Sequence, residues 1–356
     1  MSRRARRRAA GGALRRVLLL LVVVAVLAAG WAWQRHRGFA DAPMAGIEAG
    51  DSVLVARGDS LDGVLRTLRE AGVDPGDRLQ WRLLARELGA AGRIQAGEYA
   101  LDPATSPRSL LLAMRDGKVL RRNFTIVEGW NIRDLRKALA KVPDLGQETA
   151  ALDDAALMRA LGHAGQHPEG RFLPETYAWV RGDSDLDVLK RAHAAMAKAL
   201  DAAWAARAPG LPLQTKEQAL TLASIVEKET GIAEERPAIA GVFVRRLQTG
   251  MRLQTDPTVI YGMGSAYTGN IRRSDLTTDT PYNTYTRAGL PPTPIAMPGN
   301  AALRAATRPA PGDALYFVAV GDGSGRHVFS ASLDAHNAAV RAYVQRYRAQ
   351  REAAPK

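Results

Sequence analysis

Cysteine is absent from this chain of 356 residues, which excludes a disulfide framework and a thiolate metal site. Proteins of the cytosol and of a periplasm can both lack cysteine, so this absence leaves the compartment open. Histidine is scarce, and among the six residues only His163 and His167 have the i,i+4 spacing of metal ligands on a helix. Gly165 between them and Pro168 after them favour a loop. We therefore expect no metal and no cofactor.

The chain also lacks the signature of a phosphate-binding loop and that of a nucleophile elbow. The glycine-rich run at residues 321–325 fits neither pattern. This run separates two short β-type stretches, which contain Phe317 and Val328, so it predicts the loop of a hairpin.

The net charge of +13 would suit a nucleic-acid-binding protein if it were spread along the chain. Seven of the positive charges, however, precede the first apolar run: Arg3, Arg4, Arg6, Arg7, Arg8, Arg15 and Arg16. The remainder is only mildly basic, so we expect no nucleic-acid partner. The length and the hydrophobic content of 46% allow a sizeable core and two or three domains.

Residues 17–33 carry no charge over 17 positions, which is near the shortest length that spans a bilayer as a helix. Arginine is concentrated before this run, so the positive-inside rule predicts a cytoplasmic tail over residues 1–16 and an extracytoplasmic location for the residues after Trp33. Trp31 and Trp33 would then lie at the outer interface. A cleaved signal peptide is the alternative, but these bulky residues stand where small ones are needed for cleavage. Both interpretations export the rest of the chain.

Residues 34–50 mix charge with Gly and Ala without periodicity, which predicts a linker. The first folded unit is expected over residues 51–119, in the order strand (52–56), helix (from 61), helix (77–88) and strand (94–101). This order resembles the LysM-like module, which binds peptidoglycan. A spacer that only positions the next domain is the alternative.

A larger mixed α+β domain is expected over residues 120–345, followed by a polar tail at 346–356, so the fold class is α+β. It begins with a strand at 123–127, and helices are predicted at 132–140, 150–161 and 185–206. Residues 169–177 interrupt the helical pattern with aromatic and acidic groups. This loop could line a sugar site or be a packed connector with its aromatic side chains in the core.

Thr215 and Gln218 have the spacing of a capping box, which predicts a largely buried helix that ends near Gly231. On this helix Glu227 and Glu229 lie on opposite flanks of the apolar face, about 200° apart, so they cannot readily serve one site as a facing pair. A carboxyl at the edge of an apolar face is partly desolvated, and desolvation raises its pKa toward the range of a general acid. Taken alone, such a glutamate is more often an ordinary surface residue.

The segment around this helix closely resembles the endolytic murein transglycosylases of the MltG (YceG-like) family. The resemblance extends from the membrane span to about Tyr343. The motifs that carry it are residues 222–230, 242–247, 251–262, 282–285, 289–292, 295–296, 298–299, 315–318 and 327–329.

The resemblance implies that Glu227 is the catalytic residue and leaves Glu229 without an assigned role. Such an enzyme acts on nascent peptidoglycan and breaks the bond between N-acetylmuramic acid and N-acetylglucosamine without water. A protonated carboxyl gives its proton to the glycosidic oxygen, and the muramic C6 hydroxyl attacks C1 to form a 1,6-anhydro end. One carboxyl can act first as acid and then as base, since the nucleophile belongs to the substrate.

The transition state of such a cleavage resembles an oxocarbenium ion, so groups that orient the sugar should matter. In the matching motifs the candidates for binding substrate are Gln254, Thr255, Asp256, Tyr261, Asn283, Thr284 and Tyr285. Each has a structural alternative, because Asp256 could begin a helix and the tyrosines could be half-buried packing residues. Glu175 in the 169–177 loop is a further candidate, although the family usually has Asp there.

A second function class stays open. The chain could be a membrane-anchored scaffold that binds peptidoglycan strands and recruits cell-wall synthases with little cleavage. The presence of Glu227 in an intact motif favours the enzyme. The sequence does not indicate the glycan length preference, the stem-peptide preference or the oligomeric state.

Overall fold

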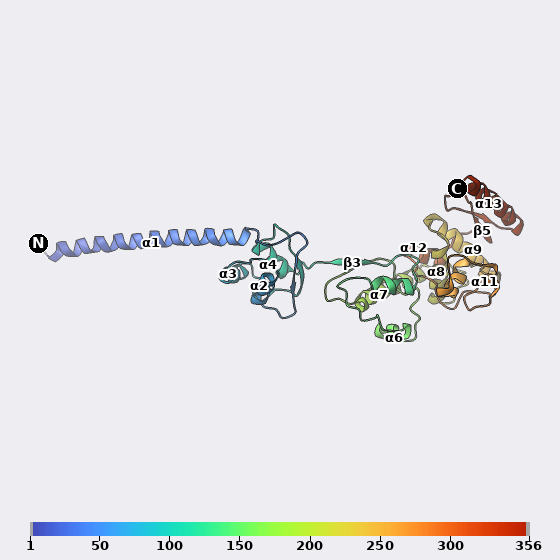
Figure 1. Cartoon of the computed structure of the whole chain (residues 1–356), viewed down its shortest axis with the longest axis horizontal. Coiled ribbons are helices and arrows are strands. Elements are labelled where there is room, and N and C mark those ends of the chain that lie inside the picture. Colours follow the sequence, from blue (N-terminus) through green and yellow to red (C-terminus); the bar gives the residue numbers. More distant parts are fainter. Residues whose placement is uncertain (1–2, 354–356) are drawn as a thin grey trace. The chain divides into compact units, whose positions relative to one another are not determined.

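The computed structural model describes residues 3–353, with side chains for residues 15–350. The chain divides into two compact units. The first holds the residues up to Arg122 together with 180–182, and the second holds 123–179 and the residues from Asp183 onward (Figure 1). Both contain helices and short two-stranded pairings, so the fold is α+β, as the sequence predicts.

Helix α1 (Arg3–Asp41) contains the apolar run. Its part from Arg15 to Asp41 is long and apolar enough to cross a membrane, and none of its most apolar window is buried in the protein. Among the described residues it is the one helix that meets this test. This helix is consistent with a single-pass membrane anchor.

The remainder of the first unit, which we call the module, has the predicted order of strand, helix, helix and strand. Strand β1 (Ser52–Val55) pairs antiparallel with β2 (Gly97–Ala100). Helices α2 (Leu61–Glu70) and α3 (Arg78–Glu87) are capped by the side chains of Ser60 and Asp77. A further helix, which the sequence analysis did not assign, is α4 (Pro107–Asp116). The core of the module includes Val64, Leu65, Leu68, Trp81, Leu84, Tyr99, Leu110 and Leu111.

The predicted linker over residues 34–50 is wrong for much of its length. Helix α1 continues to Asp41, and Ala40, Met44 and Ile47 are buried in the core of the module. The segment lacks helical periodicity because only a few of its side chains face a neighbour, and a pattern of so few residues does not stand out.

The second unit begins at Asn123, within β3 (Arg122–Thr125), and this strand pairs with β4 (Thr176–Trp179). The predicted helices are present, with slightly different ends, as α5 (Ile132–Leu139), α6 (Asp154–Ala160) and α7 (Asp185–Ala205). The loop expected at 169–177 gives way to β4 at its end. Phe172 and Tyr177 are buried, so the aromatic side chains of this connector belong to the core.

Helix α8 (Lys216–Glu229) is the central element of the second unit. It contacts α7, α9 (Arg236–Gln248), α10 (Asp256–Met263) and α12 (Asn300–Thr307). Between and beside these lie the short helices η1 (Ala233–Glu235), η2 (Gly264–Ala266) and α11 (Arg273–Thr277).

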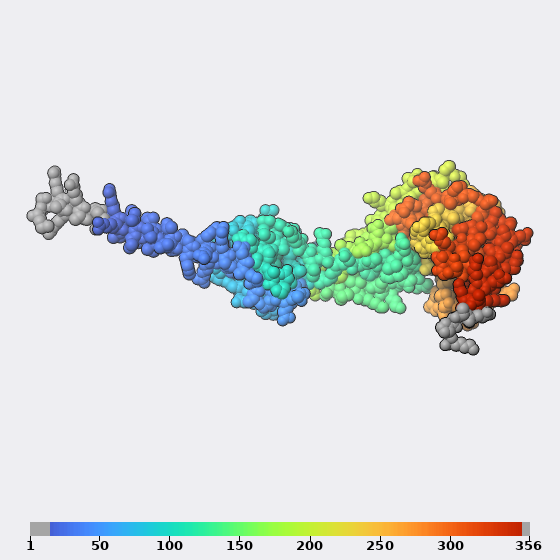
Figure 2. All heavy atoms as spheres, turned by 90° about the horizontal axis from the view of Figure 1, so that it is seen from above, coloured from blue at the N-terminus to red at the C-terminus, as the bar shows by residue number. Residues whose placement is uncertain are grey.

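The predicted hairpin near the end of the chain is present, with β5 (Tyr316–Ala319) antiparallel to β6 (His327–Ser330). Helix α13 (Leu333–Ala353) packs on both strands. The polar tail expected at 346–356 is therefore helical as far as Ala353. The C-terminal residues form one continuous face of the second unit (Figure 2, red).

Candidate functional site

Helix α8 is held from its first turn to its last by buried contacts. Thr215 caps it by accepting a hydrogen bond from the Gln218 amide, as predicted. The second half of the capping box differs, because the Gln218 side chain accepts from the Gln214 amide. At the other end Thr230 is extended, and Gly231 does not take the left-handed conformation expected of it. Every residue from Ala219 to Glu227 is buried, so both glutamates sit on a rigid support.

Glu227 is enclosed by an ion pair and a backbone amide. Its Oε1 lies 3.0 Å from Nη2 of Arg236, and its Oε2 accepts a hydrogen bond of 2.9 Å from the Gly299 amide. Only 4% of its side chain is exposed. Burial raises the pKa of the Glu227 carboxyl, while the Gly299 amide and the Arg236 charge act in the opposite direction. Arg236 also lies 3.6 Å from Oε2 of Glu128, whose side chain is 48% exposed, so this charged cluster reaches the surface.

Glu229 is only partly buried and faces a cavity of about 590 Å³. Its Oε1 accepts a hydrogen bond from the Thr255 hydroxyl. Burial raises the pKa of the Glu229 carboxyl to about 7, with the Thr255 hydrogen bond lowering it and the nearby Asp256 carboxylate raising it. The carboxyl therefore holds its proton up to near-neutral pH and can reach a molecule in the cavity.

Four of the predicted substrate-binding residues line this cavity with Glu229: Gln254, Thr255, Asp256 and Tyr285. The Tyr285 hydroxyl donates a hydrogen bond of 2.5 Å to Oδ1 of Asp256. Gln254 has φ +51°, an uncommon conformation for a residue with a side chain, which indicates local strain at the cavity wall. The remaining wall consists of Arg246, Leu253, Tyr316, Phe317, Val318, Leu333, His336, Asn337 and Val340.

Thr284 and Asn283 lie behind the wall and are fully or nearly fully buried. The Thr284 hydroxyl accepts from the Thr255 amide at 3.1 Å, and its carbonyl accepts from the Gln254 amide at 3.1 Å. Asn283 donates to the carbonyls of Asp275 and Leu276 in α11 and to that of Thr278 just after it. These contacts indicate that both residues shape the loop around the cavity.

Tyr261 and Glu175 do not line the cavity. The Tyr261 hydroxyl donates a hydrogen bond of 3.0 Å to the fully buried carboxyl of Glu169, and its ring packs against that of Tyr282. Burial raises the pKa of Glu169 to about 7. Glu175 has an exposed side chain beside β4. The predicted set is therefore divided among the cavity, its support, the separate positions of Tyr261 and Glu175, and the enclosed position of Glu227, which does not line the cavity.

The sequence analysis did not single out several residues that the structure brings to the site. Arg246 stood inside a quoted motif, but nothing in the motif indicates that its guanidinium reaches the cavity and donates to the Leu315 and Leu253 carbonyls. His336 stacks on Tyr316 at 5.2 Å, and both come from the end of the chain. Contacts over such sequence distances have no local pattern. No group of three or more potential metal ligands occurs among the described residues.

Comparison with known proteins adds three findings. The model of the YceG-like family matches residues 53–342. An endolytic murein transglycosylase of Bacillus subtilis (strain 168) is 28% identical over 310 residues, which cover 82% of this chain and 84% of that protein. The crystal structure of a yceG-like protein from Listeria monocytogenes covers 82% of this chain and 99% of its own, with a TM-score of 0.51 and 28% identity.

A protein of Streptococcus pneumoniae serotype 2 (strain D39 / NCTC 7466), also named endolytic murein transglycosylase, is 32% identical over 190 residues. These residues cover 52% of this chain but only 32% of that relative. The chain thus spans about a third of the pneumococcal protein and most of the Bacillus one.

Proposed function

The chain belongs to the YceG-like family, and from this premise we propose that it is an endolytic lytic transglycosylase of peptidoglycan. It cleaves the bond between N-acetylmuramic acid and N-acetylglucosamine within nascent strands, leaves 1,6-anhydro ends and so ends the growth of a strand. The observation that carries the proposal is a buried carboxyl of raised pKa, that of Glu227, held in the last turn of the rigid helix α8.

The reaction needs one protein carboxyl that is protonated before cleavage. This carboxyl donates its proton to the glycosidic oxygen as the bond to C1 breaks. The muramic C6 hydroxyl then adds to C1 and gives its proton to the same carboxylate, so that the protein returns to its initial state. The cavity of about 590 Å³ beside the end of α8 has room for sugar rings, and its lining includes Glu229 but not Glu227.

We assign the roles of acid and base to Glu227, the residue that the family resemblance implies. The Gly299 amide holds its Oε2, and its Oε1 contacts Arg236. In the proposed complex the glycosidic oxygen replaces Arg236 beside Oε1. Because Arg236 favours the ionised form, its displacement raises the pKa of the carboxyl further and leaves it protonated for the transfer.

Glu229 is the competing candidate, because its carboxyl borders the cavity and keeps a proton near neutral pH. In our proposal it binds sugar hydroxyls together with the other polar residues of the wall. Gln254, Asp256 and Tyr285 line the same cavity and complete this set.

A matched pair of variants tests both assignments. Glu227→Gln keeps the size of the side chain and removes the transferable proton, so anhydro-muropeptide formation should fall at least about a hundredfold, the usual contribution of a general acid. Glu229→Gln should keep the turnover rate and weaken the binding of glycan strands. Mass spectrometry of digested sacculi provides the measurement. Full activity of Glu227→Gln with loss of product in Glu229→Gln would reverse the assignment.

Thermal unfolding is the necessary control for this pair. Glu227→Gln leaves the buried Arg236 with only the half-exposed Glu128 carboxylate, 3.6 Å away, as its counter-charge, and loss of the closer partner destabilises a protein. Product formation is therefore compared at a temperature at which both variants are folded. A loss of product in folded Glu227→Gln then reports on the missing proton.

The same pair addresses the alternative of a scaffold that recruits cell-wall synthases. If both variants and the unaltered protein released equally few anhydro ends while binding sacculi, cleavage would not be the function. Loss of product in one variant with retained binding supports the enzyme.

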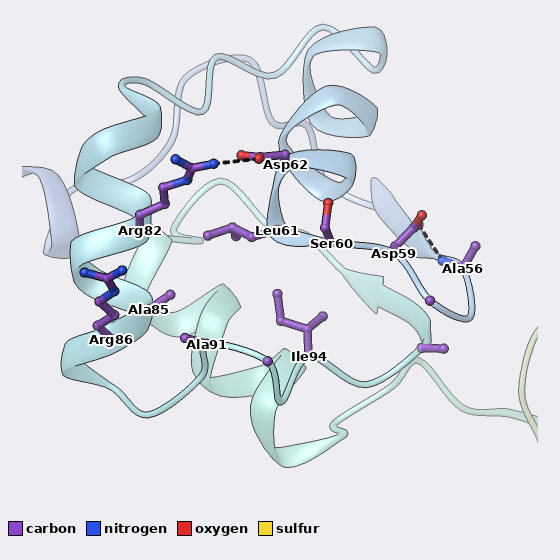
Figure 3. A pocket seen from close by; sticks show the side chains of 13 residues that line it. Ala56, Asp59, Ser60, Leu61, Asp62, Arg82, Ala85, Arg86, Ala91 and Ile94 are labelled. Carbon is purple, nitrogen blue, oxygen red and sulfur yellow. Dashed lines mark hydrogen bonds and ion pairs between the residues drawn. The ribbon is translucent and has the colours of Figure 1, made fainter.

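We further propose that residues 51–119 form a LysM-like glycan-binding module and residues 120–345 the catalytic domain. A pocket of about 570 Å³ in the module supports this proposal. It lies between the loop after β1, with Asp59 and Ser60, and the loop before β2, with Ile94 (Figure 3). Asp62 and Arg82 form an ion pair at its edge. The lining combines apolar side chains, such as Leu61 and Ile94, with polar ones, such as Asp59 and Ser60, and this combination suits a sugar ring.

The proposed location is the cytoplasmic membrane, with the N-terminus inside and both units outside. Support comes from helix α1 and from the arginines that precede residues 17–33. In this orientation the substrate is peptidoglycan beside the membrane, and cell-wall synthases are the expected neighbours.

A further inference from the structure

Helix α1 is joined to the module by packing and not by a flexible tether. Phe39 packs edge to face on Trp81 of α3 with ring centroids 5.9 Å apart, and Ala40 is fully buried. Nε2 of His36 lies 2.9 Å from the Glu87 carboxylate, and Arg108 of α4 binds Asp41 at 2.7 Å. The membrane-spanning helix and α3 therefore form one body.

These contacts fix the distance between α3 and the membrane. An α-helix rises about 1.5 Å per residue, so His36 lies about 4.5 Å and Phe39 about 9 Å beyond Trp33 along the axis. With Trp33 at the outer interface, the head-group layer extends roughly 5 to 7.5 Å outward. Glu87 contacts His36 and Trp81 contacts Phe39. The C-terminal half of α3 is thus held at the height of the head groups or just above them.

The outer face of α3 is unusually apolar and basic for a surface. Trp81, Leu84 and Ala85 face the core of the module, and the helical period places Leu79, Leu83 and Arg86 on the opposite side. Leu79 is 62% and Leu83 is 49% exposed. We call Leu83 and Arg86 the juxtamembrane face, since Leu79 lies on the same side of α3 but farther from Trp33. Arg86 also lines the pocket of the module. Leu83 and Arg86 stand between Trp81 and Glu87 in the sequence, so they share the height of the head groups.

A cavity at the junction adds a second observation. It measures about 320 Å³ and is lined by Trp33, His36, Arg37, Asp41, Glu87 and Arg108. Tryptophan and arginine often occur together at a membrane interface. The indole ring lies at the boundary of the acyl chains, and the guanidinium binds lipid phosphate. The lining of this cavity includes Glu87, the last residue of α3, which directly follows Arg86.

We propose that the juxtamembrane face rests on the phospholipid head groups, with Leu83 at the height of the head groups and Arg86 and Arg37 on lipid phosphates. The contact fixes the height and tilt of the module above the bilayer. The proposal rests on the proposed membrane anchoring of α1, but not on the cleavage reaction.

The absence of cysteine permits a clean test with single reporters in the full chain. Leu83→Cys and Leu54→Cys, each carrying an environment-sensitive fluorophore, are reconstituted in nanodiscs that contain phospholipid spin-labelled at the head group. Leu54 is the matched control because it is similarly exposed, at 44%, but lies at another part of the module. It pairs with Glu98 across β1 and β2, and the Glu98 carboxylate binds Arg122, the residue at which the chain leaves the module. We expect quenching at position 83 to be several-fold stronger than at position 54. Equal or weaker quenching at position 83 overturns the proposal.

Two further measurements test separately whether α1 spans the bilayer and whether Arg86 contributes to the head-group contact. A reporter at Leu20→Cys with an acyl-chain quencher checks the span of α1, and no quenching there overturns the anchor and the head-group contact together. Adding Arg86→Glu to Leu83→Cys should weaken the quenching at position 83, whereas Arg57→Glu, at an exposed position in the loop after β1, should not. Equal effects of the two reversals contradict a specific role of Arg86. Cleavage is assayed separately on the same proteins, so failure of the enzymatic proposal is distinguishable.

Discussion

Two carboxyls in the last turn of α8 differ because of what each oxygen contacts. Burial raises the pKa of Glu227, while the Gly299 amide and the Arg236 charge lower it. Burial raises the pKa of Glu229 to about 7, against the opposing effect of the hydrogen bond from the Thr255 hydroxyl, and the nearby Asp256 carboxylate also raises it. The proton affinity of Glu227 depends on Arg236. In our proposal substrate displaces this partner, which suits a group that must hold a proton and release it during one reaction.

Arg236→Gln should shift the pH dependence of cleavage to higher pH. The Arg236 charge lowers the pKa of Glu227, so removing it raises that pKa and increases the protonated fraction of the acid. The alkaline limb of kcat/KM, which falls about tenfold per pH unit above the pKa of the acid, should move to higher pH. The measurement is a pH profile of anhydro-product release.

Asp256→Asn is the matched control for this profile. The Asp256 carboxylate raises the pKa of Glu229, so its removal lowers the pKa of that residue. With Glu227 as the acid, the alkaline limb should stay in place. A limb that moves to lower pH in Asp256→Asn, and stays in place in Arg236→Gln, would show that the titrating group is Glu229.

Glu169→Gln should reduce the pH dependence of stability. Because the pKa of Glu169 is raised from its ordinary value of 4.5 to about 7 by burial, the folded state holds this proton more tightly than the unfolded state. The stability due to this group is fully present below pH 4.5 and is lost as the pH rises toward 7, by on the order of 3 kcal/mol. Calorimetry at pH 5 and pH 8 should show a smaller difference in Tm for the variant. Glu175→Gln, at an exposed position, is the control and should retain the wild-type difference.

Gln254→Gly should relieve strain at the cavity wall. A residue with a side chain at φ +51° costs roughly 1 to 2 kcal/mol relative to glycine. Part of this gain is offset by the greater freedom of glycine in the unfolded chain, so we expect a net change of about 1 kcal/mol or less in stability. A gain in Tm together with a rise in KM would indicate that the strain holds the Gln254 side chain toward the substrate. A large loss of stability would contradict this account.

At the scale of elements, α8 was predictable and its surroundings were not. Thr215 as cap and the buried face from Ala219 to Val226 follow from local pattern. The partners of α8 come from distant segments, for example the Ile295 amide, which donates to the Ser224 hydroxyl at 3.0 Å. Periodicity gives the direction in which a helix is buried but not the identity of its neighbour. Asp256 and Tyr285 could be named as candidates because they lie in the motifs that carry the family resemblance, while the hydrogen bond between them could not be foreseen.

Ser224→Ala should destabilise the second unit by about 1 to 3 kcal/mol, because it leaves the buried Ile295 amide without an acceptor. Thr221→Ala is the matched control on the same helix. Its hydroxyl donates only to the Glu217 carbonyl, which already belongs to the helix, so the cost should be smaller. Chemical unfolding of both variants gives the comparison. Equal losses in the free energy of unfolding would mean that the hydrogen bond from the Ile295 amide contributes little to stability.

At the scale of the whole molecule, the boundary between anchor and module differs from the one expected from composition. The segment at 34–50 resembles a linker in its residues, yet Ala40, Met44 and Ile47 complete the core of the module. A short segment of mixed charge can be essential for folding when its few apolar side chains all face inward. This arrangement makes the segment that follows the apolar span a part of the folded module.

Truncation tests this dependence. A chain that begins at residue 35 keeps the buried side chains and should retain a folded module. A chain that begins at residue 48 loses Met44 and Ile47, and burial of such side chains contributes roughly 1.5 to 3 kcal/mol each. Hydrogen exchange of the amides of α2 and α4 should be much faster in the shorter chain, while those of α8 should be unaffected because they belong to the other unit. Equal protection of α2 and α4 in the two chains would mean that the module folds without the segment and that a linker is the better description.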